Sequence, residues 1–227
     1  LQDIAQVVKI AGQIPVHADC VQSFGKVELS FKQLGLTAAT ISAHKVGGPL
    51  GVAALILKRG LDIEPILHGG GQERDIRSGT FNAPSIVSFA AAAKESVAQS
   101  NQRSEIIRKL KAELISTIKK GVPDIWVNGD QEKSLPGIIS ITFPKTDSEG
   151  LLLLLDSEGI ACSTGSACSA GVQRPSHVLL AMGLTEDETT STLRFSLNHS
   201  NTIIEIAKLG AVIASVVARS RAASGKK

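Results

Sequence analysis

The sequence is poor in aromatic residues and cysteine, and each shortage excludes a class of protein. Aromatic residues make up 3% of the 227 residues and tyrosine is absent, so the core must be aliphatic. The three cysteines, Cys20, Cys162 and Cys168, are too few for a disulfide framework and lack the paired spacing of a zinc site. We therefore expect neither a disulfide scaffold nor a metal site.

Long hydrophobic runs and an excess of one charge are missing as well. The leucine run at 151–155 is far shorter than the roughly 20 residues of a transmembrane helix, and the first residues lack the layout of a secretory signal. The net charge is only +3, and the basic tail at 218–227 reads as a frayed end. These features predict a cytoplasmic protein that contacts neither a membrane nor nucleic acid directly.

The first third of the chain alternates short apolar runs with short connections. Strands are predicted at 14–20, 36–42 and 51–58, and the segment before them reads as the end of a helix stopped at Gly12. The connections are long enough for brief crossovers, which favours an open, mostly parallel α/β sheet. Ligands of such sheets gather at the carboxyl ends of the strands.

A glycine-rich loop at 68–84 leads into a long helical pattern from 84 to 121, with a break expected near Ser100 and Asn101. Because long helices often link domains, residues 1–92 are predicted to form a partial large domain and residues 93–227 a small α/β domain. The helical stripe expected to face a core is Ile106, Leu110, Leu114 and Ile118.

The small domain is predicted to alternate strands and helices. Strands are expected at 137–143, 159–162 and 191–197, and helices at 147–159 and 176–183. The final helix begins with a capping box from Thr202 to Glu205. Its side chains predicted to point inward are Ile203, Ile206, Ile213 and Val217.

Polar side chains crowd the end of the second predicted strand. Ser42, His44 and Lys45 follow one another there, and the glycines at 47 and 48 allow close approach of a ligand. A desolvated lysine attacks carbonyl groups, and pyridoxal phosphate is the cofactor most often held in this way. The alternative is an ordinary solvated loop lysine.

Three further positions could complete such a site. Asp19 ends the neighbouring strand and could pair with the pyridine nitrogen, and Gln22 could donate to the phenolic oxygen; alternatively, Asp19 forms a turn at the strand end. Arg194, within an apolar strand, suits a carboxylate of either a substrate or the protein.

The cysteines differ in their surroundings. Cys162 ends a predicted strand and fits a buried structural role. Cys168 lies among glycine, serine and alanine, which neither bury it nor lock it in place, so a reactive thiol is favoured there.

The order of motifs HADCVQS, SAHKVGGP, HGGGQERDIRSGT, GSACSAG and LRFSL resembles the cysteine desulfurases of the NifS/IscS type. These enzymes belong to the class V aminotransferase group of fold-type I pyridoxal-phosphate enzymes. The resemblance runs along essentially the whole chain, and the combination of motifs is far more specific than any one of them. The long loop around Cys168 is similar to the group with an extended catalytic-cysteine loop.

The resemblance implies a role for each matching position. Lys45 is the Schiff-base lysine, and His44 and Ser42 bind the phosphate. Asp19 pairs with the pyridine nitrogen and Gln22 with the phenolic oxygen, while Thr80 reaches the phosphate of the other subunit in a homodimer. Cys168 takes sulfur from L-cysteine as a persulfide, leaving L-alanine, and Arg194 holds the substrate carboxylate. The sulfur then passes to an acceptor or scaffold protein for iron–sulfur clusters or tRNA thiolation.

The chain departs from the family in length. It resembles only the C-terminal part, so the residues that the family carries in its N-terminal half are not matched. We expect that half to lie on a separate chain or to have been lost, and the chain to be inactive alone.

Two other functions remain open at this level. One is a selenocysteine lyase or cysteine sulfinate desulfinase of the same fold, and the other is a non-catalytic sulfur-transfer scaffold.

Overall fold

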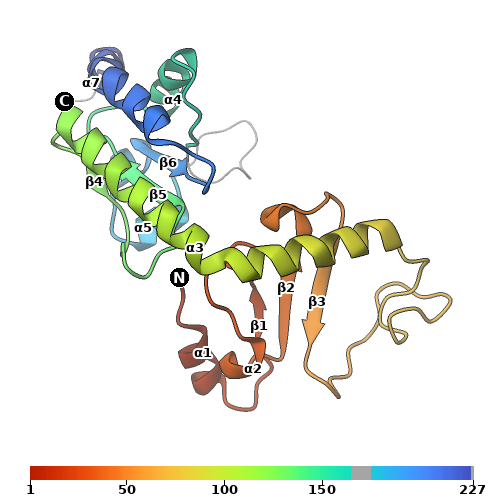
Figure 1. Ribbon diagram of the computed structural model, residues 1–227. Helices are drawn as coiled ribbons and strands as arrows, with labels where there is room; N and C mark the ends of the chain where they lie inside the picture. Colours follow the sequence, from red (N-terminus) through yellow and green to blue (C-terminus); the bar gives the residue numbers. More distant parts are fainter. Residues whose placement is uncertain (165–174, 226–227) are drawn as a thin grey trace. The chain divides into compact units, whose positions relative to one another are not determined.

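The computed structural model describes residues 1–164 and 175–225. The chain divides into two compact units, Leu1–Gln102 and Arg103–Lys227. The division lies within helix α3, Ala83–Gly121, which is continuous over 39 residues (Figure 1). The predicted break near Ser100 and Asn101 is therefore wrong, and the predicted domain boundary between residues 92 and 93 stays a prediction.

The first unit contains a three-stranded sheet in the order β1-β2-β3. Its strands are β1 (His17–Asp19), β2 (Ala38–Ser42) and β3 (Ala53–Leu57). The pair β1–β2 is parallel and the pair β2–β3 antiparallel, so the described sheet is mixed where mostly parallel strands were predicted. The cause is the connection at 43–52, because a parallel crossover needs about a dozen or more residues.

One face of this sheet is buried and the other is open. Ala18, Ala39 and Ile41 point into a hydrophobic core to which α3 contributes Phe89. On the opposite face, Leu55 remains 51% exposed. We call this side of β1, β2 and β3 the open face of the sheet.

Short helices surround the sheet of the first unit. Helix α1 (Ile4–Ala11) ends at Gly12, whose φ of 60° confirms the predicted stop. Helix α2 (Phe31–Leu34) lies in the connection between β1 and β2, and the 3-10 helix η1 (Ala43–Val46) follows β2 directly.

The second unit is built on an antiparallel sheet in the order β4-β5-β6. Two of its strands confirm predictions, and the predicted strand at 159–162 is wrong, because only Ser163 forms an isolated bridge, to Arg194. The elements of this unit besides α3 are β4 (Trp126–Val127), β5 (Ile138–Thr142), α4 (Ser148–Ser157), α5 (His177–Ala181), α6 (Glu186–Thr189), β6 (Thr192–Ser196) and α7 (Ile203–Ser224).

Two helical stripes bury most of the predicted side chains. Leu110, Leu114 and Ile118 on α3 and Ile206, Ile213 and Val217 on α7 share one core with the sheet. The prediction that Ile106 and Ile203 face the core is wrong, because their side chains are 41% and 56% exposed. Each lies one turn before the first buried residue of its stripe, where the helix face reaches solvent. The capping box from Thr202 to Glu205 at the start of α7 is confirmed.

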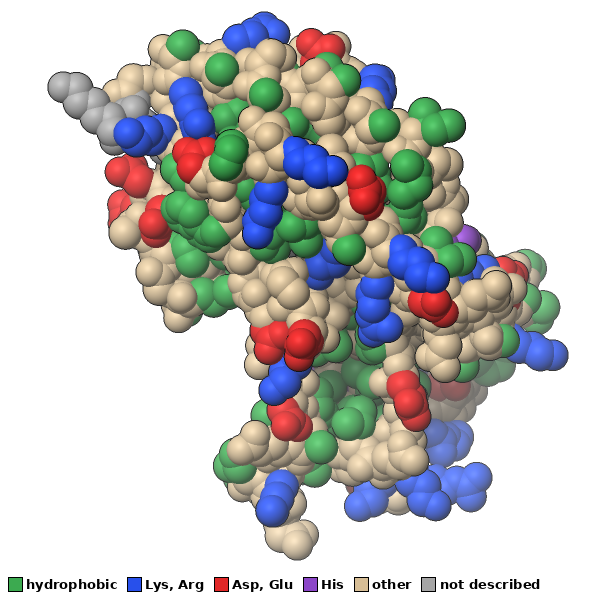
Figure 2. Space-filling model, turned by 60° about the vertical axis from the view of Figure 1, so that its left-hand side comes forward, with side chains coloured by type: hydrophobic (Ala, Val, Ile, Leu, Met, Phe, Trp, Pro, Cys, Tyr) green, Lys and Arg blue, Asp and Glu red, His purple; other side chains and the backbone are tan. Residues whose placement is uncertain are grey.

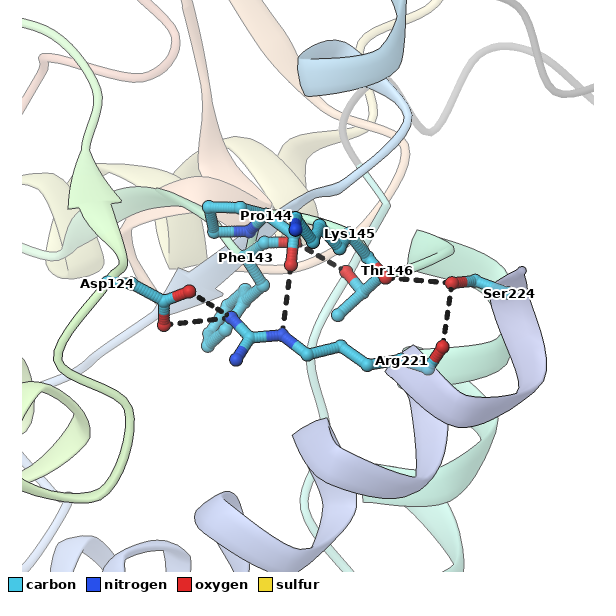
Figure 3. Close-up of polar contacts among 7 residues, drawn as sticks. All are labelled: Asp124, Phe143, Pro144, Lys145, Thr146, Arg221 and Ser224. Atoms are coloured by element: carbon cyan, nitrogen blue, oxygen red, sulfur yellow. Dashed lines mark hydrogen bonds and ion pairs between the residues drawn. The ribbon is translucent and has the colours of Figure 1, made fainter. Parts of the chain in front are cut away.

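Arg221 fastens the end of α7 to two turns of the second unit (Figure 3). Its guanidinium donates to both carboxylate oxygens of Asp124, at 2.8 and 2.7 Å, and its Nε donates to the Pro144 carbonyl oxygen at 3.0 Å. Ser224 Oγ donates to the carbonyl oxygen of Lys145, a residue in the left-handed region with φ of 64°. The network therefore holds a strained turn as well as the helix end.

Hydrophobic and charged side chains are interspersed across the face drawn in Figure 2. Among residues 1–164 and 175–225, the most exposed large hydrophobic side chain is Ile66, at 92%. None of the helices among the described residues is long and apolar enough to cross a membrane.

Candidate active site

The parallel pairing of β1 and β2 brings four predicted residues to one edge of the first sheet. Asp19 ends β1 opposite Thr40, and Ser42 ends β2. His44 and Lys45 follow at once in η1. Because the strands are parallel, their carboxyl ends meet at the same edge. Asp19 and Ser42 also share the open face, since residues two apart in a strand point the same way.

Ser42 and His44 form a polar pair at this edge. Ser42 Oγ and His44 Nδ1 are 2.7 Å apart, with the serine buried and the imidazole exposed. The contact fixes the imidazole through one ring nitrogen and leaves the other, Nε2, directed away from Ser42. The pair therefore offers a hydroxyl and an imidazole to an anion.

Glycines close the turn behind Lys45. Gly47 has a φ of 86°, and a Cβ on Gly48 would lie 3.0 Å from Ala43 Cβ. The turn thus needs glycine for its own packing, which adds to the predicted role of letting a ligand approach. Lys45 itself is exposed.

Asp19 forms a turn at the end of β1, which was the alternative to a cofactor contact, but one of its carboxylate oxygens can still accept a hydrogen bond from a ligand. Its Oδ1 accepts a hydrogen bond from the Val21 N–H at 2.9 Å, so the residue does form the turn after β1. Within residues 1–164 and 175–225, its other carboxylate oxygen has no hydrogen-bond partner. That oxygen remains free for a protonated ring nitrogen.

Gln22 and an unpredicted residue, Lys26, lie in the same turn. Lys26 Nζ donates to Gln22 Oε1 at 3.3 Å. Burial, and to a smaller extent the charge of Lys45, lowers the pKa of Lys26. Lys26 lies close to the same edge of the sheet, because it follows Gly25, where an added Cβ would lie 3.1 Å from Val46 Cγ1 in η1. The spacing of four residues from Gln22 is the one sequence signal for it, and it is weak.

Thr80 lies in the loop that follows β3. This loop is held by Ser78 Oγ, which accepts from the Gly71 N–H at 3.3 Å, and by Gln72 Oε1, which accepts from the Gly79 N–H at 2.9 Å. Thr80 is exposed, and no hydrogen bond among the described residues links it to the sheet edge.

Arg194 lies in the second unit, on the central part of β6. Its backbone pairs with Ser140 on β5 and exchanges hydrogen bonds with Ser163, at 2.7 and 3.0 Å. Its Nε is buried and has no hydrogen-bond partner in the described part of the chain. A buried guanidinium nitrogen without a partner needs an explanation, and a bound carboxylate would supply one. Cys168 lies outside the described residues.

Cys162 has the surroundings of a structural thiol. It packs partly buried against the core of the second unit. Burial, with a smaller contribution from the charge of Asp156, raises the pKa of Cys162 to about 11. Burial also raises the pKa of Cys20 in the first unit. Over the described ranges, no group of three or more histidine, cysteine or acidic residues could hold a metal ion.

Cys162 is therefore expected to resist alkylation. At pH 8, a pKa near 11 instead of 9.0 leaves about 100-fold less thiolate, the reactive form, so iodoacetamide should label it about 100-fold more slowly than an ordinary thiol. The rate should rise as the pH approaches 11. Peptide mass spectrometry over a time course measures this, with the urea-unfolded chain as the control. Equal rates in the folded and unfolded chains would contradict the burial of this thiol.

Comparisons with known proteins agree with the resemblance in the motifs. The chain is 42% identical over 219 residues to an IscS-like cysteine desulfurase from Mycobacterium tuberculosis, covering 96% of this chain and 56% of that protein. It is 35% identical over 224 residues to cysteine desulfurase IscS 1 from Archaeoglobus fulgidus, covering 99% of this chain and 58% of that protein. The structure matches a NifS-like protein from Rickettsia africae with a TM-score of 0.85 and 37% identity, over 95% of this chain and 57% of that one.

The chain thus spans somewhat more than half the length of these relatives. The sequence profile of the aminotransferase class-V family matches residues 1–209. This family consists of pyridoxal-phosphate enzymes with the fold-type I architecture that the motifs imply. By this match over most of its length, the chain belongs to the aminotransferase class-V family.

Proposed function

We propose that the protein acts as a pyridoxal-phosphate-dependent cysteine desulfurase, converting L-cysteine to L-alanine and placing the sulfur on Cys168. The observation that carries the proposal is the parallel pairing of β1 and β2, which brings Asp19 and Lys45 to one edge. The names of the relatives, several of which are cysteine desulfurases, support it.

The residues at the sheet edge fit pyridoxal phosphate by the chemistry of their donors and acceptors. The free carboxylate oxygen of Asp19 suits the pyridine nitrogen, and the Ser42–His44 pair suits the phosphate. Lys45 supplies the amine that binds the aldehyde, and Gln22 supplies an amide for the phenolic oxygen. When bound, the cofactor supplies an electron sink for the carbon atoms of the substrate.

Lys45 has two tasks in this proposal. Its amine would hold the cofactor, and the same Nζ would move a proton during the reaction. Arg194 binds the substrate carboxylate, for which its unpartnered buried Nε is the supporting observation. His44 and Ser42 keep the phosphate in place throughout.

The sulfur step transfers one atom and needs no external oxidant. The thiolate of Cys168 attacks the substrate sulfur, an S–S bond forms, and the bond between sulfur and Cβ breaks. Cβ takes up a proton and the product is alanine, so that one thiol and one cysteine give one persulfide and one alanine. Cys162 is unsuited to this step, because its high pKa keeps the thiol protonated.

The assembly around this site is also part of the proposal. Thr80 reaches the cofactor phosphate of a partner subunit in a homodimer, and the persulfide passes to an acceptor or scaffold protein for iron–sulfur clusters or tRNA thiolation. The cytoplasmic location stays a prediction.

The test is the reaction itself, followed with pyridoxal phosphate and L-cysteine after the chain, which we expect to be inactive alone, has been combined with the N-terminal half of a relative. We expect alanine to form, and sulfur to appear as a persulfide on Cys168 by mass spectrometry. Cys168→Ser should abolish sulfur transfer, whereas Cys162→Ser should leave it intact. Release of selenium from selenocysteine without turnover of cysteine would favour the lyase instead. Binding of an acceptor protein without any sulfur labelling would favour a scaffold.

A further inference from the structure

The turn that follows β1 is held rigidly against two other elements. The residue at its centre, Gly25, is buried with a φ of 69°. A Cβ placed on it would lie 2.2 Å from Ser96 Oγ on α3 and 3.1 Å from Val46 Cγ1 in η1. Ser96 Oγ also donates to the Gly25 carbonyl oxygen at 3.1 Å. The turn is therefore clamped between α3 and η1.

This clamp fixes the position of Lys26 relative to Lys45. Lys26 directly follows Gly25, and Lys45 directly precedes Val46, the residue that Gly25 approaches. The backbone positions of the two lysines are thereby held near each other at the sheet edge. Asp19 ends β1 and His44 precedes Lys45 at this edge, and Glu95 precedes Ser96 on α3. The charge of Lys45 helps lower the pKa of Lys26, which agrees with this closeness.

Lys26 restricts the side chain of Gln22 to one orientation. A glutamine amide can present either its oxygen or its nitrogen to a neighbour, but a lysine ammonium has only donors. The 3.3 Å contact with Lys26 Nζ therefore requires the Gln22 oxygen, and the Nε2 group with its two donors points away from Lys26. Half-burial of Lys26 strengthens this restriction, since a partly desolvated ammonium has fewer waters to pair with.

We propose that Lys26 is a positioning residue, which turns the amide of Gln22 so that Nε2 donates to the phenolic oxygen of pyridoxal phosphate. The inference rests on the proposed function and adds a residue to it. Without Lys26, the amide can rotate and present its oxygen to the phenolic oxygen, where two acceptors repel each other. Lys26 thus acts through Gln22 and touches neither substrate nor cofactor.

The test compares variants that separate the donor from the charge. Lys26→Met removes both, Lys26→Arg keeps both, and Lys26→Gln keeps an uncharged donor. Each is made in the chain combined with the N-terminal half of a relative, and Lys26→Met is also combined with Gln22→Ala. Lys32→Met, an exposed lysine on α2, serves as the matched control.

The main measurement is the pH midpoint at which the absorbance of the bound cofactor changes. Loss of a donor to the phenolic oxygen should move the midpoint upward by about one pH unit in Lys26→Met. Lys26→Arg should keep the natural midpoint, Lys26→Gln should shift it only slightly, and Lys32→Met should leave it unchanged. In the Gln22→Ala background, Lys26→Met should have no further effect. Without the cofactor, the side-chain amide NMR signals of Gln22 should shift in Lys26→Met and stay in place in Lys26→Arg.

Three results would overturn the inference while leaving the desulfurase proposal standing. The first is an unchanged pH midpoint in Lys26→Met. The second is a shift caused by Lys26→Met in the Gln22→Ala background that equals its shift in the natural protein. The third is a Gln22→Ala midpoint equal to that of the natural protein. The second would show that Lys26 acts by its charge alone. Borohydride reduction distinguishes the other failure: if the natural protein shows no pyridoxyl group on Lys45, the proposed function falls and the inference falls with it.

Discussion

Replacing Lys45 with alanine is expected to abolish covalent retention of pyridoxal phosphate and to lower cysteine turnover by at least about 10²-fold, the usual contribution of a positioned proton-transfer group. Lys45 follows β2 within the 3-10 helix η1, where the amine meets the edge shared with Asp19. Alanine removes the amine, and η1 contains no other lysine that could replace it.

Reduction with borohydride and peptide mass spectrometry measure the first effect, and alanine formation measures the second. Lys58→Ala, an exposed lysine just after β3, is the matched control and should retain both properties. Lys45→Arg should fail like Lys45→Ala, because a guanidinium stays protonated and does not attack the aldehyde. A pyridoxyl group found on Lys26 in place of Lys45 would refute the assignment.

Gly25→Ala is expected to destabilise the first unit by about 2–5 kcal/mol, the sum of a left-handed backbone and an overpacked contact. The backbone cost arises because Gly25 has a φ of 69°, and the contact cost because the new Cβ would meet Ser96 Oγ at 2.2 Å. Ser96 Oγ can rotate away from the new Cβ, but Ser96 Cβ at 3.0 Å and Val46 Cγ1 at 3.1 Å also border this position and would have to shift.

Hydrogen exchange in peptides of residues 1–102 reports the loss of stability for this unit. Gly47→Ala is the control: Gly47 is left-handed, with φ of 86° and ψ of 11°, and nothing lies within 4 Å of its added Cβ, so it should cost only the backbone part. Ser96→Ala in the Gly25→Ala background should recover part of the loss by removing the closest atom. If Gly47→Ala costs as much as Gly25→Ala, the clamp between α3 and η1 contributes nothing.

The sheet edge could be predicted because it depends on short-range features. Two apolar runs ending in polar residues were enough to expect Asp19 and Lys45 at neighbouring strand ends, and the β1–β2 register places them so. The direction of β3 was not predicted, because it depends on the length of one connection. Apolar patterning alone does not distinguish parallel from antiparallel neighbours.

Other features needed tertiary information. Ser100 and Asn101 suggested a break in the long helix, yet Ser96 and Ser104 on either side are buried, and packing keeps the helix intact. The apolar segment at 159–162 was read as a strand, but the bridge forms only at Ser163. Lys26 was missed because its importance comes from one hydrogen bond and one clamped glycine, and the four-residue spacing from Gln22 is only a weak signal in the sequence.

The open face of the first sheet has a practical consequence for work at the bench. Among the described strands, β1 and β3 are the outer ones, and each carries backbone amides and carbonyls without a strand beside it. Such borders recruit further strands. The protein is therefore expected to aggregate at high concentration. Light scattering alongside each assay distinguishes such aggregates from a dimer.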